Sequence, residues 1–280
     1  MNSKKLLLSL GIIASFFTYT QCEQTTSNHT ITVFVHGTFP IRKCLQYVPG
    51  ARSLIYCPQG LSLAKKLPKS YHFHKLAQGC VDLNPHLYAL DQFYTFGWKS
   101  EHVYDTTRMQ AAKNLVIELQ KLVTTYYHKH KTIPKIQLLG FSHGGNVVLH
   151  TANYLPLFVN NQQVEVTAWI FGTPVQRVNQ ELVNSTNFHK VYSIYSKKDW
   201  IQRMDPQGLQ DKKYTKDSFW SDRTFKPESS CIQANFTVNG KPICHTYYRC
   251  IFKYFPTIQH LVEEKSGDMH SGMIDINLEI

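Results

Sequence analysis

The sequence lacks the short motifs that most often bind metals, nucleotides and dinucleotides. It contains no C-x-x-C pair, no H-E-x-x-H pattern, no P-loop and no glycine-rich dinucleotide fingerprint. We therefore expect no metal and no organic cofactor, and no nucleic acid as a partner. Internal repeats and low-complexity tracts are also missing, and residues 23–280 are enough for one domain with a sizeable buried core.

Long apolar runs are missing as well. The most apolar stretch, residues 6–17, is interrupted by small and polar residues and falls short of the roughly 20 apolar residues that span a bilayer. It follows Lys4 and Lys5 and precedes a small or polar stretch, so residues 1–22 are expected to be a signal peptide. The mature protein would then be secreted or periplasmic. A lipid anchor at Cys22 is the less favoured alternative, because the three residues before it do not fit such a site.

Acidic residues are few relative to basic ones. The chain has 30 Lys and Arg against 19 Asp and Glu, which gives a formal net charge of +11. The basic residues are scattered rather than gathered in one run, a pattern typical of a solvated face. Such a surface would attract anionic substrates or an anionic membrane surface.

Cysteine is present in a number that favours disulfide bonds. Of the seven cysteines, six remain after removal of residues 1–22, and an even number in an oxidising compartment favours disulfides over metal binding. Cys44 and Cys57 could close one loop, and Cys231 could pair with Cys244 or Cys250. The connectivity stays open.

Apolar strands alternate with helical patterns along the chain. Strands are expected at residues 31–35, 93–96, 136–139, 164–171 and 191–195. A helix capped by Asp105 should follow the second of them, with one apolar face made by Met109, Ala112, Leu115, Val116, Leu119, Leu122 and Val123. This alternation predicts an α/β fold with a mostly parallel sheet covered on both faces.

Residues 39–91 do not follow this alternation. The segment contains five prolines, three cysteines and several aromatic residues. It would be either a lid or cap over a site or a disulfide-tied surface loop, and the sequence does not choose between them.

The most informative motif is Gly140-Phe141-Ser142-His143-Gly144-Gly145. It follows an expected strand and leads directly into a helix-like stretch. A tight strand-to-helix turn of this kind lifts the serine hydroxyl clear of the sheet, and small residues on either side permit the turn. The motif predicts a nucleophile elbow at Ser142, the alternative being an ordinary glycine-rich turn.

An activated serine also needs donors for the oxyanion that forms when it attacks a carbonyl. The first strand runs into His36-Gly37-Thr38-Phe39, where glycine allows backbone N–H groups to turn toward Ser142. One donor is expected from the backbone of Thr38 or Phe39 and the other from the N–H of His143. His36 is expected to be structural.

Together these pieces resemble the α/β-hydrolase superfamily, and within it the serine lipases and esterases. The matching segments are Val35-His36-Gly37-Thr38, Phe96-Gly97-Trp98, the turn at Ser142, and Phe171-Gly172-Thr173-Pro174. Their order and spacing are more specific than any one of them. The resemblance implies an α/β-hydrolase fold and a catalytic triad in the chain order serine, acid, histidine.

The acid implied by this resemblance is Asp199, which lies just past the strand at residues 191–195. Asp205 is the reserve candidate, and a solvated loop role for Asp199 is the alternative. The histidine is expected at His245, between an expected hairpin over residues 232–244 and a final helix over residues 256–264. His270 is its rival, whereas His260 lies within the helical pattern and is expected to be structural.

These residues predict an exported serine hydrolase that cleaves a small-molecule or lipid ester. His245 would accept the proton of Ser142, and Asp199 would hold the imidazole in the required tautomer. The same triad would also serve a thioesterase or an amidase. A non-catalytic binding protein on a hydrolase scaffold is the alternative outside the enzymes.

Overall fold

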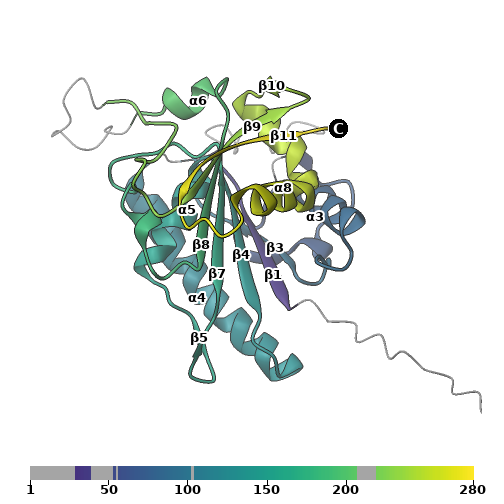
Figure 1. Ribbon diagram of the computed structural model, residues 1–280. Coiled ribbons are helices and arrows are strands. Elements are labelled where there is room, and N and C mark those ends of the chain that lie inside the picture. The colour runs from purple at the N-terminus through teal and green to yellow at the C-terminus, as the bar shows by residue number, and fades with distance from the viewer. Residues whose placement is uncertain (1–28, 39–52, 55, 102–103, 207–218) are drawn as a thin grey trace, which may run out of the picture.

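Runs rich in β-branched and aromatic residues form the parallel centre of a nine-stranded sheet (Figure 1). The computed structural model describes residues 29–38, 53–54, 56–101, 104–206 and 219–280. The strand order is β10-β9-β8-β7-β4-β1-β3-β2, and β11 pairs with β9. The parallel strands are β1 (Thr30–Val35), β3 (Phe93–Gly97), β4 (Lys135–Phe141), β7 (Val166–Phe171), β8 (Lys190–Tyr195), β9 (Ile232–Val238) and β11 (Gly272–Leu278). β2 (Gly60–Leu63) and β10 (Lys241–Pro242) are antiparallel to their neighbours, and β5 (Phe158–Val159) forms a separate hairpin with β6 (Gln162–Gln163).

Helices connect the strands and cover both faces of the sheet. They are α3 (His72–Leu83), α4 (Asp105–His130), α5 (His143–His150), α6 (Trp200–Arg203), α7 (Tyr248–Ile251) and α8 (Phe255–Ser266). Short 3₁₀ turns lie at Ala64–Lys66, Thr151–Asn153, Leu182–Asn184, His245–Tyr247 and Phe252–Tyr254.

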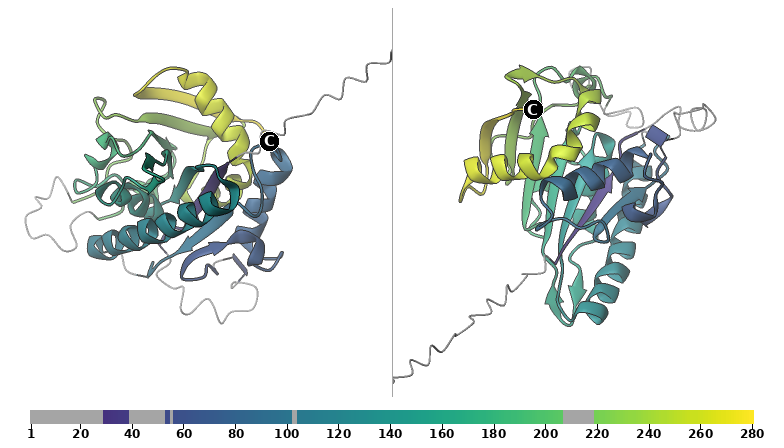
Figure 2. Two further views of the ribbon diagram at one scale, coloured as in Figure 1. Left: turned by 90° about the horizontal axis from the view of Figure 1, so that it is seen from below. Right: turned by 90° about the vertical axis from the view of Figure 1, so that its right-hand side faces the viewer.

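The two faces of the sheet bury separate hydrophobic cores. On one face, α4 and α5 pack Leu115, Leu119 and Val148 against strand residues such as Ile31. On the other face, α3 and α8 contribute a largely aromatic core, with members Phe34, Phe73, Trp169, Phe171, Phe252 and Phe255. Figures 1 and 2 show α3 and α8 on the side of the sheet opposite α4. The expected α/β fold with a mostly parallel, doubly covered sheet is therefore confirmed.

The long helix α4 differs from the expectation in two details. It begins at Asp105, but Tyr104 occupies the cap position and the Asp105 carboxylate bonds to Arg108 and His150 instead. Met109, expected on the buried face, is 37% exposed. In the first turns of α4 the buried position is taken by Arg108, a polar residue, where the apolar pattern predicted Met109.

The described part of residues 39–91 is more regular than expected. β2 extends the sheet beyond β3, and α3 buries Phe73, Leu76, Ala77 and Cys80 in the aromatic core. Residues 53–91 thus belong largely to the body of the domain. The expected lid or cap also includes residues 39–52, which lie outside the described residues.

β11 is a strand that the sequence pattern missed. The expected final helix is present as α8, but the chain then returns along β9 as a parallel strand. Several β11 side chains are partly or fully exposed, so its apolar pattern is weak.

The expected disulfides at Cys231 are not formed. Cys231 is a buried thiol, and Cys244 and Cys250 are exposed thiols. Cys57 is buried, and Cys44 lies outside the described residues, so the pairing of these two remains a prediction. Residues 1–22, the expected signal peptide, also lie outside. In the described part of the chain, no helix is both long and apolar enough to cross a membrane.

Candidate active site

The carboxyl ends of the parallel strands meet at one edge of the sheet, at the top of Figure 1. The residues that follow these strands are therefore gathered there from distant parts of the chain. They are His36 and Gly37 after β1, Trp98 after β3, Ser142 after β4, Thr173 after β7 and Asp199 after β8. This edge is where open parallel sheets place their sites.

Ser142 joins β4 to α5 through a backbone conformation that side chains rarely adopt. Its φ is 53° and its ψ is −130°, a region that costs about 1–3 kcal/mol and persists only when its surroundings hold it. The Ser142 N–H donates to the Phe171 carbonyl oxygen at 2.9 Å, and the Ser142 carbonyl accepts from the Gly145 N–H at 2.9 Å. The turn is thus tied to β7 on one side and to its own helix on the other.

Two glycines allow the backbone to pack closely around this turn. A Cβ at Gly144 would collide with the Val35 and His36 carbonyl oxygens, and one at Gly37 would lie 2.9 Å from the Ser142 Cβ. The end of β1 therefore lies directly against the turn at Ser142. Within the described residues, the Ser142 hydroxyl makes no hydrogen bond, and the residue is 7% exposed.

Asp199 and His245 form a hydrogen-bonded pair at the same edge. The Asp199 Oδ2 lies 2.8 Å from the His245 Nδ1, and its Oδ1 accepts from the Gln202 N–H at 3.0 Å, which caps α6. Asp199 is fully buried. Because a carboxylate only accepts, the Nδ1 of His245 carries the proton and Nε2 is left as the basic nitrogen.

The imidazole of His245 packs against Phe141, the residue before Ser142. Their ring centroids are 4.9 Å apart, and the ring planes are tilted by 31°. This contact brings the Asp199–His245 pair next to the strand-to-helix turn. The arrangement comprises a serine on a strained turn, a histidine with an available ring nitrogen, and a buried carboxylate that orients it.

The rival histidines lie elsewhere. His270 is exposed and lies shortly before β11, which begins at Gly272. Since β11 runs parallel to β9, its start lies at the opposite edge of the sheet from Asp199. His260 is an exposed residue of α8 that pairs with Glu264 at 3.9 Å. His36 is buried and stacks on Trp98, with ring centroids 6.1 Å apart.

Two of the three residues expected to supply oxyanion donors, His143 and Thr38, lie at or next to the turn at Ser142. His143 is the first residue of α5, and the first N–H groups of a helix have no acceptor within it. Thr38 follows Gly37, whose backbone lies against Ser142. Phe39, the alternative to Thr38, lies outside the described residues.

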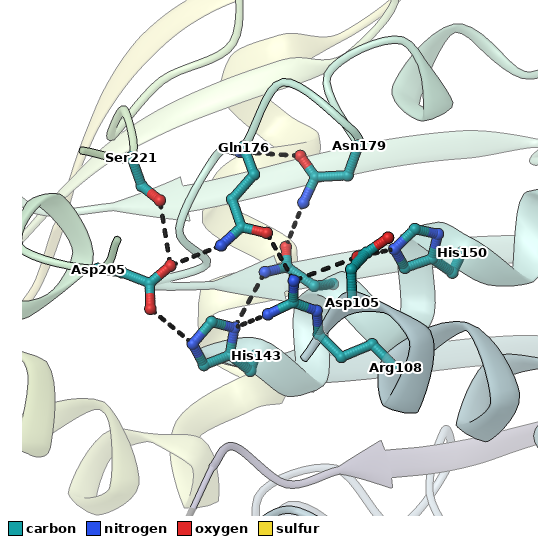
Figure 3. Close-up of polar contacts among 9 residues, drawn as sticks. Asp105, Arg108, His143, His150, Gln176, Asn179, Asp205 and Ser221 are labelled. Carbon is teal, nitrogen blue, oxygen red and sulfur yellow. Dashed lines mark hydrogen bonds and ion pairs between the residues drawn. The ribbon is translucent and has the colours of Figure 1, made fainter. Parts of the chain in front are cut away.

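The side chain of His143 enters a buried polar network that the sequence did not predict (Figure 3). Its Nε2 lies 2.8 Å from the Asp205 Oδ1, and its Nδ1 lies 2.9 Å from an Arg108 NH group. Gln176 connects Arg108 to Asp205, at 2.8 Å and 2.6 Å respectively. Further members are Asp105, Asn146, His150, Asn179 and Ser221.

Charges within this network favour a neutral His143 beside an ionised Asp205. Burial lowers the pKa of His143, the Asp205 carboxylate opposes this effect, and Arg108 lowers the pKa further. Burial raises the pKa of Asp205, but hydrogen bonds from His143 and Gln176 and the charge of Arg108 outweigh it, so this pKa is lowered overall. Asp205, the reserve acid, thus pairs with His143 in the structure, and Asp199 pairs with His245.

The sequence contains few signals from which this network could have been predicted. Asp105 and Arg108 are three positions apart in a helix, as in many helical ion pairs, but such pairs are common and usually exposed. Gln176, Asn146 and Asn179 belong to no recognisable motif. Among the described residues, no group of three or more His, Cys, Asp or Glu is placed to hold a metal ion.

Comparison with known proteins adds little to this geometry. No family model and no curated protein matches the chain. One similar solved structure is a lipase-esterase related protein from Clostridium acetobutylicum ATCC 824. It is 12% identical, the match covers 89% of this chain and 86% of the other, and the TM-score is 0.30. A TM-score this low supports no conclusion about the fold or function of this chain.

Proposed function

We propose that this protein is a serine hydrolase of the α/β-hydrolase type that cleaves carboxylic esters through a Ser142–His245–Asp199 triad. The observation that carries the proposal is the Asp199–His245 hydrogen bond of 2.8 Å, formed beside the strained turn that presents Ser142. A buried carboxylate, an oriented imidazole and a serine at a strand-to-helix turn have complementary roles in acyl transfer.

In the proposed reaction the Ser142 Oγ attacks the ester carbonyl while the His245 Nε2 takes its proton. Asp199 stabilises the imidazolium, and the N–H of His143 together with that of Thr38 or Phe39 stabilises the oxyanion. The ester C–O bond then breaks, and the leaving alcohol takes the proton from His245. Water, activated by the same histidine, releases the acid from the acyl-enzyme.

A fluorophosphonate probe tests this proposal directly. We expect the probe to form one covalent adduct with the wild-type protein, and peptide mass spectrometry should place it on Ser142. A panel of p-nitrophenyl esters of graded chain length, with a thioester and an anilide, should show preferential ester cleavage. Preferential thioester or anilide cleavage with the adduct at Ser142 would support the thioesterase or amidase alternative. Absence of both adduct and turnover would support the binding-protein alternative.

Exposed apolar side chains around α6 favour a lipid-like ester among these substrates. Trp200 is 62% exposed, Ile201 54%, Met204 63% and Trp220 54%. Trp200 directly follows the proposed catalytic acid, and an isolated β-bridge joins Pro206 to Trp220. We call these four residues the α6 patch, and α6 itself lies at the edge of the sheet where the parallel strands end (Figure 1).

Basic residues flank the α6 patch in the chain. Lys197, Lys198 and Arg203 are exposed, and none forms an ion pair with a residue that the structure describes. Tryptophan with nearby lysine and arginine is a combination that binds at the interface of an anionic bilayer. The patch therefore favours an ester presented at such a surface.

Removing two apolar side chains of the α6 patch should weaken binding to anionic vesicles. We expect Trp200→Ala combined with Met204→Ala to lower partitioning onto phosphatidylglycerol-containing vesicles by about tenfold or more, since burying each side chain is worth about 1.5–3 kcal/mol. Sedimentation with the vesicles measures this. Phe158→Ala is the matched control, because Phe158 is 51% exposed and belongs to β5, which lies at the opposite end of the molecule from α6 (Figure 1). Equal partitioning of all three proteins would contradict the role of the patch.

Export of the protein is part of the same proposal. The signal peptide expected over residues 1–22 would deliver it to the outside of the cytoplasmic membrane, as a secreted or periplasmic protein. Cleavage after residue 22, read by N-terminal sequencing of the mature protein, tests this.

A further inference from the structure

We propose that Asp205 is a positioning residue, which acts through the His143 side chain to hold the backbone N–H of His143 as the oxyanion donor. This inference rests on the proposed hydrolase function. Among the described residues, no hydrogen bond or ion pair joins Asp205 to the proposed triad, so it would influence catalysis through the backbone at the start of α5.

The position of His143 makes its backbone important. It directly follows Ser142, whose φ of 53° is strained, and it is the first residue of α5. A strained conformation persists only when neighbouring interactions hold it in place. The His143 N–H must also point to where negative charge develops, and small displacements of an oxyanion donor weaken catalysis strongly.

The side chain of His143 is held at both ring nitrogens. Arg108 can only donate hydrogen bonds, so the Nδ1 of His143 must accept from it. The ionised Asp205 can only accept, so the Nε2 of His143 must donate to it. This fixes the tautomer, and it excludes His143 as a general base because its only basic nitrogen already faces a guanidinium.

The same logic orients Gln176. Its carbonyl oxygen accepts from Arg108, and its amide nitrogen donates to Asp205. His143 and Gln176 are therefore parallel bridges between a residue that only donates and a residue that only accepts (Figure 3). Turning either side chain around would bring donor against donor at one end and acceptor against acceptor at the other.

The network also spans four separate segments of the chain. Arg108 comes from α4, His143 from α5, Gln176 from the segment after β7, and Asp205 from the segment after α6. Asp205 also accepts from the Ser221 hydroxyl at 3.1 Å. These contacts bind the start of α5 to several separate elements. A backbone N–H held from several elements keeps its position and direction.

Replacing Asp205 by asparagine should disturb this arrangement specifically. Asparagine keeps the shape but replaces one accepting oxygen with a donating NH₂ group, which must face either His143 or the pair Gln176 and Ser221. We expect Asp205→Asn to lower kcat about tenfold with KM unchanged, a part of the effect of losing an oxyanion donor outright. Its affinity for a trifluoromethyl ketone, which forms an oxyanion on the enzyme, should fall by the same factor.

Glu165→Gln is the matched control. Glu165 also pairs with a basic residue and a histidine, Lys135 at 3.0 Å and His189 at 3.8 Å, but it directly precedes β7 and lies at the other end of the parallel strands from Ser142. We expect it to leave kcat and ketone affinity unchanged. If Asp205→Asn does not fold, Ser221→Ala, which removes one bond to Asp205, should show a smaller fall in kcat.

The outcomes separate this inference from the proposed function. Equal kcat for Asp205→Asn and Glu165→Gln, with only the melting temperature of Asp205→Asn lowered, would overturn the positioning role while leaving the hydrolase intact. An unchanged kcat in a folded Ser221→Ala protein would do the same if Asp205→Asn fails to fold. A wild-type protein without esterase activity or adduct would overturn the function itself.

Discussion

Ser142→Ala should abolish ester hydrolysis while leaving the fold intact. We expect kcat/KM to fall by about 10⁴-fold or more, because the nucleophile of an acyl-transfer triad is not replaced by any neighbouring group. Labelling by a fluorophosphonate should disappear. Steady-state kinetics with a p-nitrophenyl ester and gel detection of the labelled protein measure the two effects.

The structure also predicts that this variant stays folded. The Ser142 hydroxyl makes no hydrogen bond with the described residues, and alanine keeps the Cβ around which the turn is packed. The free energy of unfolding should therefore change by less than about 1 kcal/mol, as expected when no hydrogen bond is lost. Retained hydrolysis in Ser142→Ala would show that another residue is the nucleophile.

His245→Ala should be nearly as damaging, and His270→Ala should be harmless. Removing the imidazole deprives Ser142 of its base, so we expect kcat/KM to fall by about 10⁴-fold. His270 lies at the opposite edge of the sheet, and its replacement should leave the rate of ester cleavage unchanged. Parallel kinetic measurements on the two variants make the comparison.

Stability must be measured alongside these rates. Loss of His245 leaves the buried Asp199 carboxylate without one partner, which costs about 1–3 kcal/mol. Added imidazole should restore part of the activity of a folded His245→Ala protein, which a misfolded protein would not show. Loss of activity in His270→Ala with retention in His245→Ala would reverse the assignment.

The parts of the fold that the sequence predicted are those with strong local periodicity. The strands β1, β3, β4, β7 and β8 and the helix α4 carry apolar patterns long enough to distinguish helix from strand. β11 and α3 escaped notice because β11 is half exposed and α3 lies in a segment dominated by proline and aromatic residues. Their structure depends on contacts with β9 and with the aromatic core, which no local pattern contains.

The residues of the candidate site also fall into those that a local sequence pattern predicts and those that it does not. Ser142 is visible in the sequence because a strand-to-helix turn needs small residues at fixed positions, and Asp199 because it follows a strand. The pairing of Asp205 with His143 joins residues 62 positions apart. The other members of the network are ordinary polar residues in two helices and two loops, so only their positions in the folded chain reveal them.

The placement of β9 has a consequence for the order in which this chain folds. β9 is buried along nearly all its length, and its outer edge is covered from Ile232 to Val238 by β11. During synthesis that edge stays open until residues 272–278 have left the ribosome. An apolar strand with unpaired backbone groups is a template for pairing with another chain. This late closure leaves the β9 edge open to aggregation in the nascent protein.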